Sequence, residues 1–538
     1  MWQQNYTPLA GSLGWSALMA GLPIFVLLWL LGVKRKPAWM AGVAGLGSAI
    51  FLALVVYRMP AASMVSAVAY GGAFGLFPIG WIVFWAIVLY RITVETGNFE
   101  VIKDSVGNLT ADRRLQALLI AFALSGFIEG AAGFGTPVAV AAAMMAGLGF
   151  SPFFAAAICL LGNTSPVAFG SIGIPIVTLA GITGLGQQEL SAAAGKILAP
   201  VSLVVPGYMV VVMAGWRGLG GVLPGALACG AAFAITQYFV STLLGPQISA
   251  ITSSAAAIAA LVALLKLWQP SDRFRLEGNP AAPAAASHHH SFGRTIRAWS
   301  PYLLLVLFVL LWGQNSIKAA LNSLTLPIQW PGLHNQIERI PPVVAKAAPY
   351  AAVFNLNWLS AAGTACLLAT LSAAVLLGVS PSRYGRILAA TARQLFLSMI
   401  TIASVLALAF LMNYCGATAT LGLAFAATGM LFPFFSSMLG WLGVFLTGSD
   451  TSSNALFGNL QVITANRLGL DPVLMAASNA AGGVMGKMIS LQSIAVAAAA
   501  TGLHGADEAK LFRFTLRHSI ILASLIGLVT VCWAYVFR

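Results

Sequence analysis

The sequence predicts an all-α, polytopic membrane protein, from its hydropathy and from its long runs without charge. Of the 538 residues, 59% are hydrophobic and 7% are charged, and the mean hydropathy is +0.90. No Lys, Arg, Asp or Glu occurs in residues 218–265 or 394–449. Because a helix of about 20 apolar residues crosses a bilayer, each run can hold about two crossings, and we expect about 12 to 14 in the chain. A membrane β-barrel would instead show short alternating segments.

The basic residues indicate topology rather than binding of nucleic acid. The formal net charge is +14, but Lys and Arg stand in short clusters at the ends of apolar segments, which is typical of cytoplasmic loops. Residues 34–36 follow the first apolar segment, about 13–31, and a second cluster that includes Arg114 follows two further crossings. A third cluster, 510–517, precedes a last segment of about 520–536. We therefore expect both termini outside the cytoplasm.

Cysteine and histidine suggest neither a metal site nor a cofactor. The five cysteines lack CxxC spacing and are interpreted as small buried hydrophobic residues rather than disulfides: Cys159, Cys229, Cys366, Cys415 and Cys532. The three adjacent histidines at 288–290 have no second cluster to complete a metal site. We expect no cofactor.

Composition divides the chain into two transmembrane halves, residues 1–265 and 299–538. The segment between them, 266–298, contains "EGNPAAPAAASHHHSFG", a composition typical of a flexible linker, and we place it in the cytoplasm. The core of the first half is expected at about 60–200 and that of the second at about 380–510.

Short matches between the halves suggest an internal repeat. They recur at an offset of 318 to 320 residues. The pairs are "FIEG" at 127–130 with "FLTG" at 445–448, "LGFSP" at 148–152 with "LGLDP" at 468–472, and "TGL" at 183–185 with "TGL" at 501–503. Such matches can also arise by chance in a chain rich in Ala, Gly and Leu. Duplicated halves are typical of secondary transporters, which bind substrate where the repeats meet near the bilayer midplane.

Polar, Gly-rich interruptions of the apolar segments mark the candidate site. Gly, Pro and Ser break helices and expose backbone groups, which is tolerated at membrane depth only inside protein or beside a watery cavity. Broken helices also direct their N-termini at anions. The candidate substrate-binding residues are Asn163, Thr164 and Ser165 in the first half and Ser449, Thr451, Ser452, Asn454 and Asn479 in the second. Small residues also serve close helix packing, and for any single one of them that role is the simpler interpretation.

Three ionisable residues fall within these interruptions: Glu129, Asp450 and Lys487. A charge at the bilayer centre costs at least about 2.5 to 3.5 kcal/mol, so each is a functional candidate. Glu129 and Asp450 are candidate proton carriers. Our hypothesis gives the proton to Glu129, which has no charged neighbour from Leu115 to Gln188, and the substrate to Lys487 with the Ser/Thr/Asn cluster. The alternative for Lys487 is a salt bridge that only joins the halves.

The segments "GFIEGAAGFGTPVAVAAAMMAGLGFSPFFAAAICLLGNTSPVAFGSIGIP" and "LTGSDTSSNALFGNLQ" resemble those of the bacterial L-lactate permease family, and the resemblance extends from the first helix to the last. It implies a symporter of the bacterial cytoplasmic (inner) membrane that imports L-lactate, and also D-lactate and glycolate, with a proton. The larger ion-transporter superfamily to which this family is assigned implies inverted repeats, re-entrant hairpins, an elevator motion and a homodimer, the last two by fold analogy alone.

Three other functions remain as alternatives. A sodium-coupled carboxylate or organic-anion transporter is the nearest, because unwound Ser, Thr and Asn backbone also suits Na⁺. An intramembrane enzyme is disfavoured by the absence of HExxH and GxSxG motifs. A channel fits the composition and would differ in not accumulating substrate against a gradient.

Overall fold

The computed structural model describes residues 1–537 except 108, 134–135, 271–289 and 504–505. Among the described residues, eleven helices are long and apolar enough to cross a membrane, or twelve with one bent pair, Pro152–Gly162 and Val167–Thr183, counted as one span. The count of twelve spans agrees with the lower end of the 12 to 14 crossings expected from the sequence. The prediction of a polytopic helical fold with broken helices is confirmed. Most of the predicted linker, with His288 and His289, lies outside the described residues.

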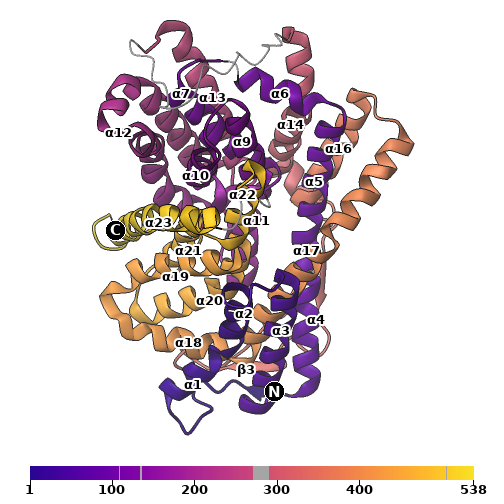
Figure 1. Cartoon of the computed structure of the whole chain (residues 1–538). Coiled ribbons are helices and arrows are strands. Elements are labelled where there is room, and N and C mark those ends of the chain that lie inside the picture. Colours follow the sequence, from indigo (N-terminus) through magenta and orange to yellow (C-terminus); the bar gives the residue numbers. More distant parts are fainter. Residues whose placement is uncertain (108, 134–135, 271–289, 504–505, 538) are drawn as a thin grey trace.

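The chain forms its elements in the following order (Figure 1). The N-terminal group is α1 (Leu13–Ala20), α2 (Leu22–Gly32), α3 (Ala38–Phe51), α4 (Ala61–Phe74), α5 (Trp81–Glu95) and α6 (Asn98–Gly107). The next is α7 (Arg113–Ala117), η3 (Leu118–Leu124), α8 (Ser125–Ala131), α9 (Thr136–Gly147), α10 (Pro152–Gly162), η4 (Val167–Phe169), α11 (Gly170–Thr183), α12 (Gln187–Leu243) and α13 (Ser249–Leu267). The second half contains α14 (Phe292–Gly313), α15 (Asn315–Asn322), α16 (Ala362–Leu377), α17 (Pro381–Cys415), α18 (Ala417–Phe425), α19 (Phe432–Thr447), α20 (Asp450–Leu468), α21 (Pro472–Lys487), α22 (Leu491–Thr501) and α23 (Ala506–Tyr535).

A small β segment lies beside the N-terminus, in the lower part of Figure 1. Its strands are β1 (Trp2–Gln3), β2 (Leu326–Gln329), β3 (Ile337–Arg339), β4 (Ala348–Pro349) and β5 (Val353–Leu356). β3 pairs in parallel with β1 and antiparallel with β4, and β2 pairs antiparallel with β5. The N-terminus is therefore fixed to the polar segment that follows α15.

The sequence matches between the halves fall at equivalent helix ends. In "LGFSP" and "LGLDP" the polar residue caps a helix whose first residue is proline: Ser151 caps α10, and Asp471 caps α21. Each cap side chain accepts a backbone N–H of the first turn, and proline is tolerated there because its missing N–H has no helical partner anyway. In both "TGL" matches the glycine ends a helix in the left-handed conformation, Gly184 after α11 and Gly502 after α22. The two halves therefore repeat one order of elements.

Each half contains a helical hairpin followed by a broken helix. Hairpin 1 is α7 to α9 (residues 113–147), and hairpin 2 is α19 and α20 (residues 432–468). α10 and α11 meet at a bend of 66°. α21 and α22 are separated by a short turn that ends at Ser490, the N-cap of α22. In Figure 1, hairpin 1 lies in the upper part of the molecule and hairpin 2 in the lower part.

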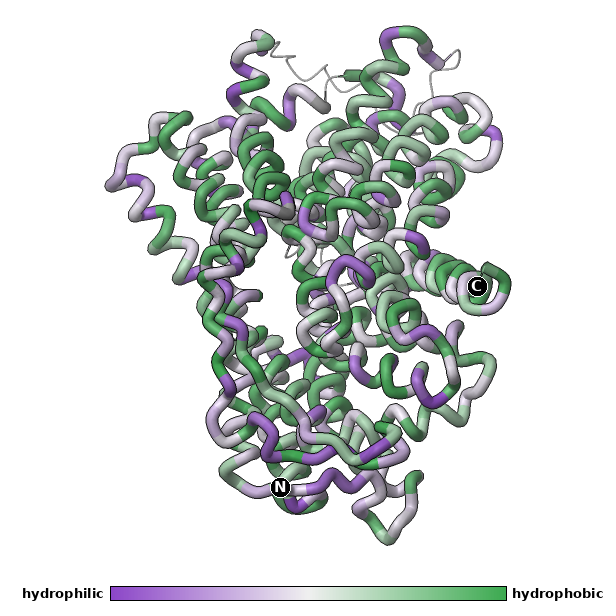
Figure 2. The backbone as a smooth tube through the Cα atoms, turned by 180° about the vertical axis from the view of Figure 1, so that it is seen from behind, coloured by the Kyte–Doolittle hydropathy of each residue, from purple (hydrophilic) through white to green (hydrophobic). Residues whose placement is uncertain are grey.

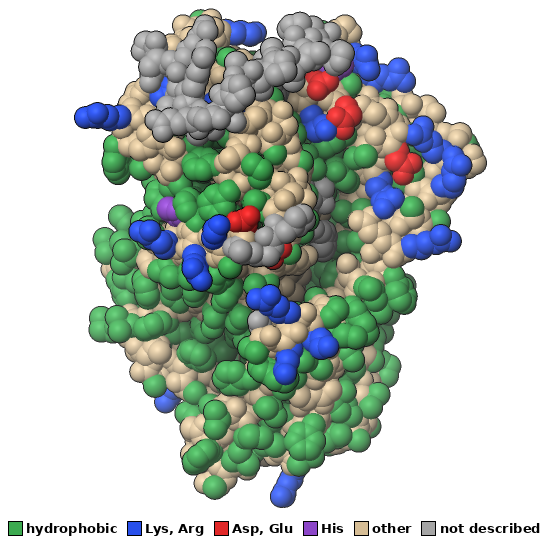
Figure 3. All heavy atoms as spheres, in the orientation of Figure 1, with side chains coloured by type: hydrophobic (Ala, Val, Ile, Leu, Met, Phe, Trp, Pro, Cys, Tyr) green, Lys and Arg blue, Asp and Glu red, His purple; other side chains and the backbone are tan. Residues whose placement is uncertain are grey.

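The surface suits contact with lipid. The tube in Figure 2 is mostly hydrophobic, and its most hydrophilic stretches lie near the top and beside the N-terminus. On the face in Figure 3, hydrophobic side chains cover much of the lower half, while Lys and Arg gather in the upper half and in clusters at mid-height. Large exposed side chains include Phe25, Trp216 and Phe239. A soluble protein rarely leaves so many apolar side chains exposed together.

The last helix begins earlier than the sequence suggested. The prediction of a segment at about 520–536 is wrong at its start, because α23 begins at Ala506 and continues through the basic cluster. His518 consequently lies inside a candidate membrane span, where its Nδ1 is 2.7 Å from the Tyr208 hydroxyl. Burial of the polar ring against this partner explains how the span tolerates it.

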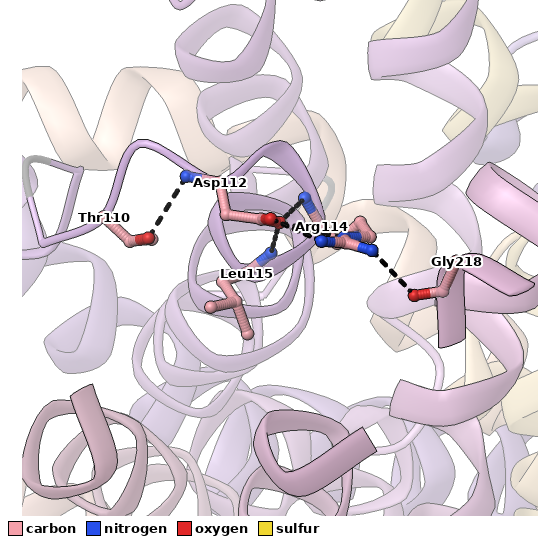
Figure 4. A network of polar contacts seen from close by, with 5 residues as sticks. All are labelled: Thr110, Asp112, Arg114, Leu115 and Gly218. Atoms are coloured by element: carbon pink, nitrogen blue, oxygen red, sulfur yellow. Dashed lines mark hydrogen bonds and ion pairs between the residues drawn. The ribbon is translucent and has the colours of Figure 1, made fainter. Parts of the chain in front are cut away.

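A buried ion pair anchors hairpin 1 to α12 (Figure 4). The Asp112 carboxyl accepts the backbone N–H groups of Arg114 and Leu115 at the start of α7, and it binds the Arg114 guanidinium at 2.7 Å. Arg114 Nη1 also donates to the Gly218 carbonyl at 3.0 Å. Arg114 is fully buried, although it belongs to a basic cluster that the sequence assigns to a cytoplasmic helix end. The pair satisfies both charges while it fixes where the hairpin starts.

Replacing Arg114 by Gln should destabilise the protein strongly, because removing one member of a buried pair leaves the other uncompensated, at a cost of about 3 to 5 kcal/mol. The midpoint of thermal unfolding in detergent should fall by several degrees. Arg386→Gln, which alters an exposed arginine of α17, is the control and should change little. Equal midpoints for the two variants would contradict this role of Arg114.

Candidate functional site

A small cavity lined by charged, hydroxyl and apolar side chains lies where the tips of both hairpins and the broken helix α10–α11 meet. Its volume is about 140 Å³, room for several water molecules but less than a drug-sized pocket. We call it the central cavity. Its lining residues from the hairpins and broken helices are Glu129, Val167, Gly170, Ser171, Ile174, Pro175, Thr447, Gly448, Ser449, Asp450, Thr451, Ser452, Lys487 and Gln492, while α17 adds Ser398, Thr401 and Ile402 and α3 adds Ala38. All three ionisable candidates therefore share one cavity.

Glu129 is held by the first half. Its carboxyl is buried, with 4% of the residue exposed, and Oε2 accepts a hydrogen bond from Asn163 Nδ2 at 2.9 Å. Asn163 is in turn fixed by Ser125, whose hydroxyl donates to Asn163 Oδ1 at 2.8 Å. A Cβ on Gly170 would lie 2.8 Å from Glu129 Oε1, so only glycine lets the broken helix pass this close to the carboxyl. The glycines around Glu129 thus make room for it.

The backbone after Gly170 is strained beside the cavity. Ser171 and Ile172 have φ values of 47° and 60°, in the left-handed region that residues other than Gly and Asn rarely adopt. The Ser171 hydroxyl donates to the Ala132 carbonyl at 3.1 Å, which ties the turn to the tip of hairpin 1. Strain of this kind persists only when its surroundings enforce it, and it collects at functional sites.

Asp450 is the first residue of α20 and lies at the tip of hairpin 2. Gly448, at φ 73°, ends α19, and the Ser449 hydroxyl accepts the Ser452 N–H to begin α20. Asp450 is 3% exposed, and neither of its carboxyl oxygens accepts a hydrogen bond from any residue that the structure describes. A Cβ on Gly483 would lie 2.2 Å from Asp450 Oδ1. Asp450 is therefore a buried acid that packs against glycine and interacts electrostatically with Lys487 and Asn454.

Lys487 supplies the positive charge of the cavity. It is the last residue of α21, where the partial negative charge of a helix C-terminus favours a cation, and it is 9% exposed. Its ammonium donates to the Gly448 carbonyl at 3.0 Å and interacts electrostatically with Asp450, although no ion pair forms within 4.0 Å among the described residues. A lysine has three donors, so Lys487 retains capacity for a bound anion.

A chain of amides joins the two halves behind the cavity. Gln461 donates to Asn479 at 3.0 Å, Asn479 to Asn454 at 2.9 Å, and Asn454 to the Pro175 carbonyl at 3.1 Å. All three side chains are fully buried. The network fixes α20 against α11 and satisfies a carbonyl next to the bend, so Asn454 and Asn479 act on the cavity through the backbone rather than by lining it.

The structure brings together most of the predicted site residues. Glu129, Asp450 and Lys487 line the cavity with Ser449, Thr451 and Ser452. Asn163, Asn454 and Asn479 lie behind it, as described above. Thr164 and Ser165 do not line it: the Thr164 hydroxyl donates to the Leu161 carbonyl, and the Ser165 carbonyl accepts from Gln237.

Sequence reasoning missed several lining residues. Ser171, Thr447 and Gln492 belong to the polar interruptions but were not selected, because hydroxyl and amide residues there are too common to rank. Ser398 and Thr401 come from α17, and the sequence feature that could have identified them is a pair of hydroxyl residues in a long charge-free run. Only the folded arrangement shows that α17 closes one wall of the cavity.

Comparisons with known proteins agree with this arrangement. The model of the L-lactate permease family matches residues 16–537. The chain is 45% identical to an L-lactate permease of Bacillus subtilis (strain 168), over all of this chain and 99% of that protein. It is 44% identical to the glycolate permease GlcA of Escherichia coli (strain K12), over all of this chain and 98% of that protein.

A solved structure resembles the fold. MtrF of Neisseria gonorrhoeae, described as an antimetabolite efflux pump, aligns at a TM-score of 0.50 and 14% identity, with 95% of this chain and 97% of that chain covered. This likeness concerns the fold alone, whereas the sequence matches identify the family over the whole length. The chain belongs to the L-lactate permease family.

Proposed function

We propose that the protein imports L-lactate, and also D-lactate and glycolate, together with a proton across the bacterial inner membrane. The names of the relatives support the substrate class. The observation that carries the proposal is that one cavity of about 140 Å³ holds two carboxyls and one ammonium at the meeting of the two hairpin tips. Hydroxyls from both halves line the same cavity and suit a substrate with one carboxylate and one hydroxyl.

Lys487 binds the substrate carboxylate in this account. A lactate monoanion needs a cation or a helix N-terminus for its carboxylate, and the cavity offers both, Lys487 and the start of α20. The hydroxyls of Ser449, Thr451 and Ser452 are within the same wall and can bind the 2-hydroxyl group. Asp450 acts as the counter-ion that keeps the ammonium compensated when the cavity is empty.

Proton coupling follows from the repulsion of like charges. Two negative charges that share a small buried site oppose each other, so one of them takes up a proton. When lactate enters, Glu129 takes up the proton in this account, while Asp450 keeps its electrostatic interaction with Lys487, and the substrate's charge replaces that of Glu129. The charge of the cavity then stays the same, with one proton carried for each lactate. Asp450 is the other candidate for this role.

Proteoliposomes provide the direct test. With an inward gradient of one pH unit and no sodium, the wild type should accumulate labelled L-lactate up to about tenfold, because one pH unit corresponds to a tenfold free-energy step. Glu129→Gln, which mimics the protonated acid, should lose this accumulation and retain lactate exchange. Glu189→Gln, at an exposed acid of α12, is the matched control and should behave as wild type.

Each other outcome has a clear meaning. Loss of accumulation in Asp450→Asn but not in Glu129→Gln would move the proton to Asp450. Accumulation by the wild type only when sodium is present would overturn proton symport in favour of sodium coupling. Flux that never accumulates lactate would favour a channel.

Replacing Lys487 by Gln should weaken substrate binding, because a hydrogen bond to a charged group contributes about 1.5 to 3 kcal/mol, or about 10- to 100-fold in affinity. The KM for L-lactate exchange should rise accordingly, while Lys487→Arg should recover part of the affinity. Lys318→Gln, in the exposed helix α15, is the control. An unchanged KM in Lys487→Gln would leave the lysine only a structural role.

A further inference from the structure

A second and larger cavity lies between the β segment and the far ends of α11 and α20. Its volume is about 670 Å³. We call it the vestibule. The β segment contributes Arg339 and Tyr350, α17 contributes Phe410 and Asn413, and the C-terminal parts of α11 and α20 form the opposite wall. Because β3 pairs with β1, the vestibule lies on the side of the N-terminus, which the basic clusters predict to be external.

The vestibule has the charge expected of a site that attracts anions. Of the described residues that line it, none is Asp or Glu, and Arg339 is the one with a formal charge at neutral pH. The neighbouring Glu338 faces away, because successive residues of a strand point to opposite sides, and its carboxylate accepts Gln3 Nε2 at 2.8 Å. The positive charge of Arg339 is therefore not cancelled within the cavity.

Two groups at this cavity have donor capacity that the protein does not use. Arg339 Nε is buried and has no hydrogen-bond partner among the described residues, and the guanidinium carbon lies 4.5 Å from the ring centre of Tyr350. Asn413 is 6% exposed, and its Nδ2 has no hydrogen-bond partner among the described residues. Buried N–H donors without acceptors are rare and indicate a missing partner. Guanidinium and amide donors are what a carboxylate binds.

The vestibule and the central cavity lie at opposite ends of the same two helices. α20 contributes Ser452 to the central cavity and Asn459 to the vestibule, about 10 Å further along at 1.5 Å per residue. A void of about 30 Å³ adjoins the central cavity, with which it shares Ile174 and Ile402, and it shares no lining residue with the vestibule. The vestibule and the central cavity have no lining residue in common, so the vestibule is a site of its own.

We propose that the vestibule is a capture site, where Arg339 and Asn413 bind the carboxylate of a small monocarboxylate before it passes along α11 and α20 to the central cavity. The proposal rests on the proposed function for the identity of the substrate. Arg339 is in this account a binding residue of one side only, because the vestibule opens on the side of the β segment. Substrate that enters from the other face of the membrane reaches the central cavity without passing Arg339.

The test is transport measured separately from each face, in right-side-out and inverted vesicles. With L-lactate as the probe, Arg339→Gln should raise the KM about tenfold from the vestibule side, with the maximal rate from that side unchanged. The KM from the opposite side should also stay unchanged, while the maximal rate from that side falls, because without a gradient the ratio of maximal rate to KM must be equal in the two directions. Arg339→Lys should recover part of the affinity because it restores the charge. Lys346→Gln, an exposed cation of the same segment outside the vestibule, should have no effect.

The remaining outcomes separate the two proposals. An equal KM for Arg339→Gln and wild type from the vestibule side would overturn the capture site and leave the proposed function intact. A similar rise from both sides, or a fall in the maximal rate alone, would also overturn it, because either result indicates a general structural role. Failure of the wild type to transport lactate from either side would instead refute the proposed function.

Discussion

The cost of charge in an apolar medium is the constraint on which this structure depends. Glu129, Asp450 and Lys487 could not lie separately at membrane depth, since each would bury an unpaired charge. The fold brings them to one cavity where they interact, and it is built from the hairpins and broken helices that place them there. The same constraint governs Asp112 and Arg114, which are buried as a pair. The buried charges of Asp112 and Arg114 thus stabilise the fold, whereas those of the central cavity can interact with a substrate.

Glycine and amide residues let the helices break without leaving the backbone unsatisfied. Gly170 and Gly483 let helices approach the two acids, where any side chain would collide with a carboxyl oxygen. The Gln461–Asn479–Asn454 chain supplies a donor to the Pro175 carbonyl beside the bend. Each glycine contact lies within one half, whereas the bond from Asn454 to Pro175 joins α20 to α11 across the halves. A change of angle between the halves would therefore act on the cavity through this amide chain. A site formed at such an interface is what alternating access requires.

Much of the fold could be predicted from the sequence, because the bilayer determines how long the apolar segments are and where basic clusters stand between them. The matches "LGFSP" with "LGLDP" and the two "TGL" segments marked true helix ends, since they combine N-caps, Pro and left-handed Gly. The candidate site could be located from its ionisable residues, because charged residues are rare in the apolar parts of this chain. Hydroxyl residues are too common in the chain to identify a site. The wall that α17 forms and the positions of Asn454 and Asn479 behind the cavity depend on helix packing, which the sequence does not show. The burial of Arg114 could not be foreseen either, because sequence position alone does not distinguish a solvated cation from a buried one.

Protection of a cysteine in the central cavity by substrate tests the central claim most directly. Ser452→Cys places a thiol in the wall formed by hairpin 2, and its labelling by a small methanethiosulfonate reagent can be followed by mass spectrometry. The reference is native Cys532, which is exposed, so the prediction that all five cysteines are buried is wrong for this one. The account predicts that L-lactate slows labelling at position 452 and not at Cys532, and that neutral lactamide slows neither. Labelling at position 452 at the same rate with and without lactate would contradict the assignment of this cavity as the substrate site.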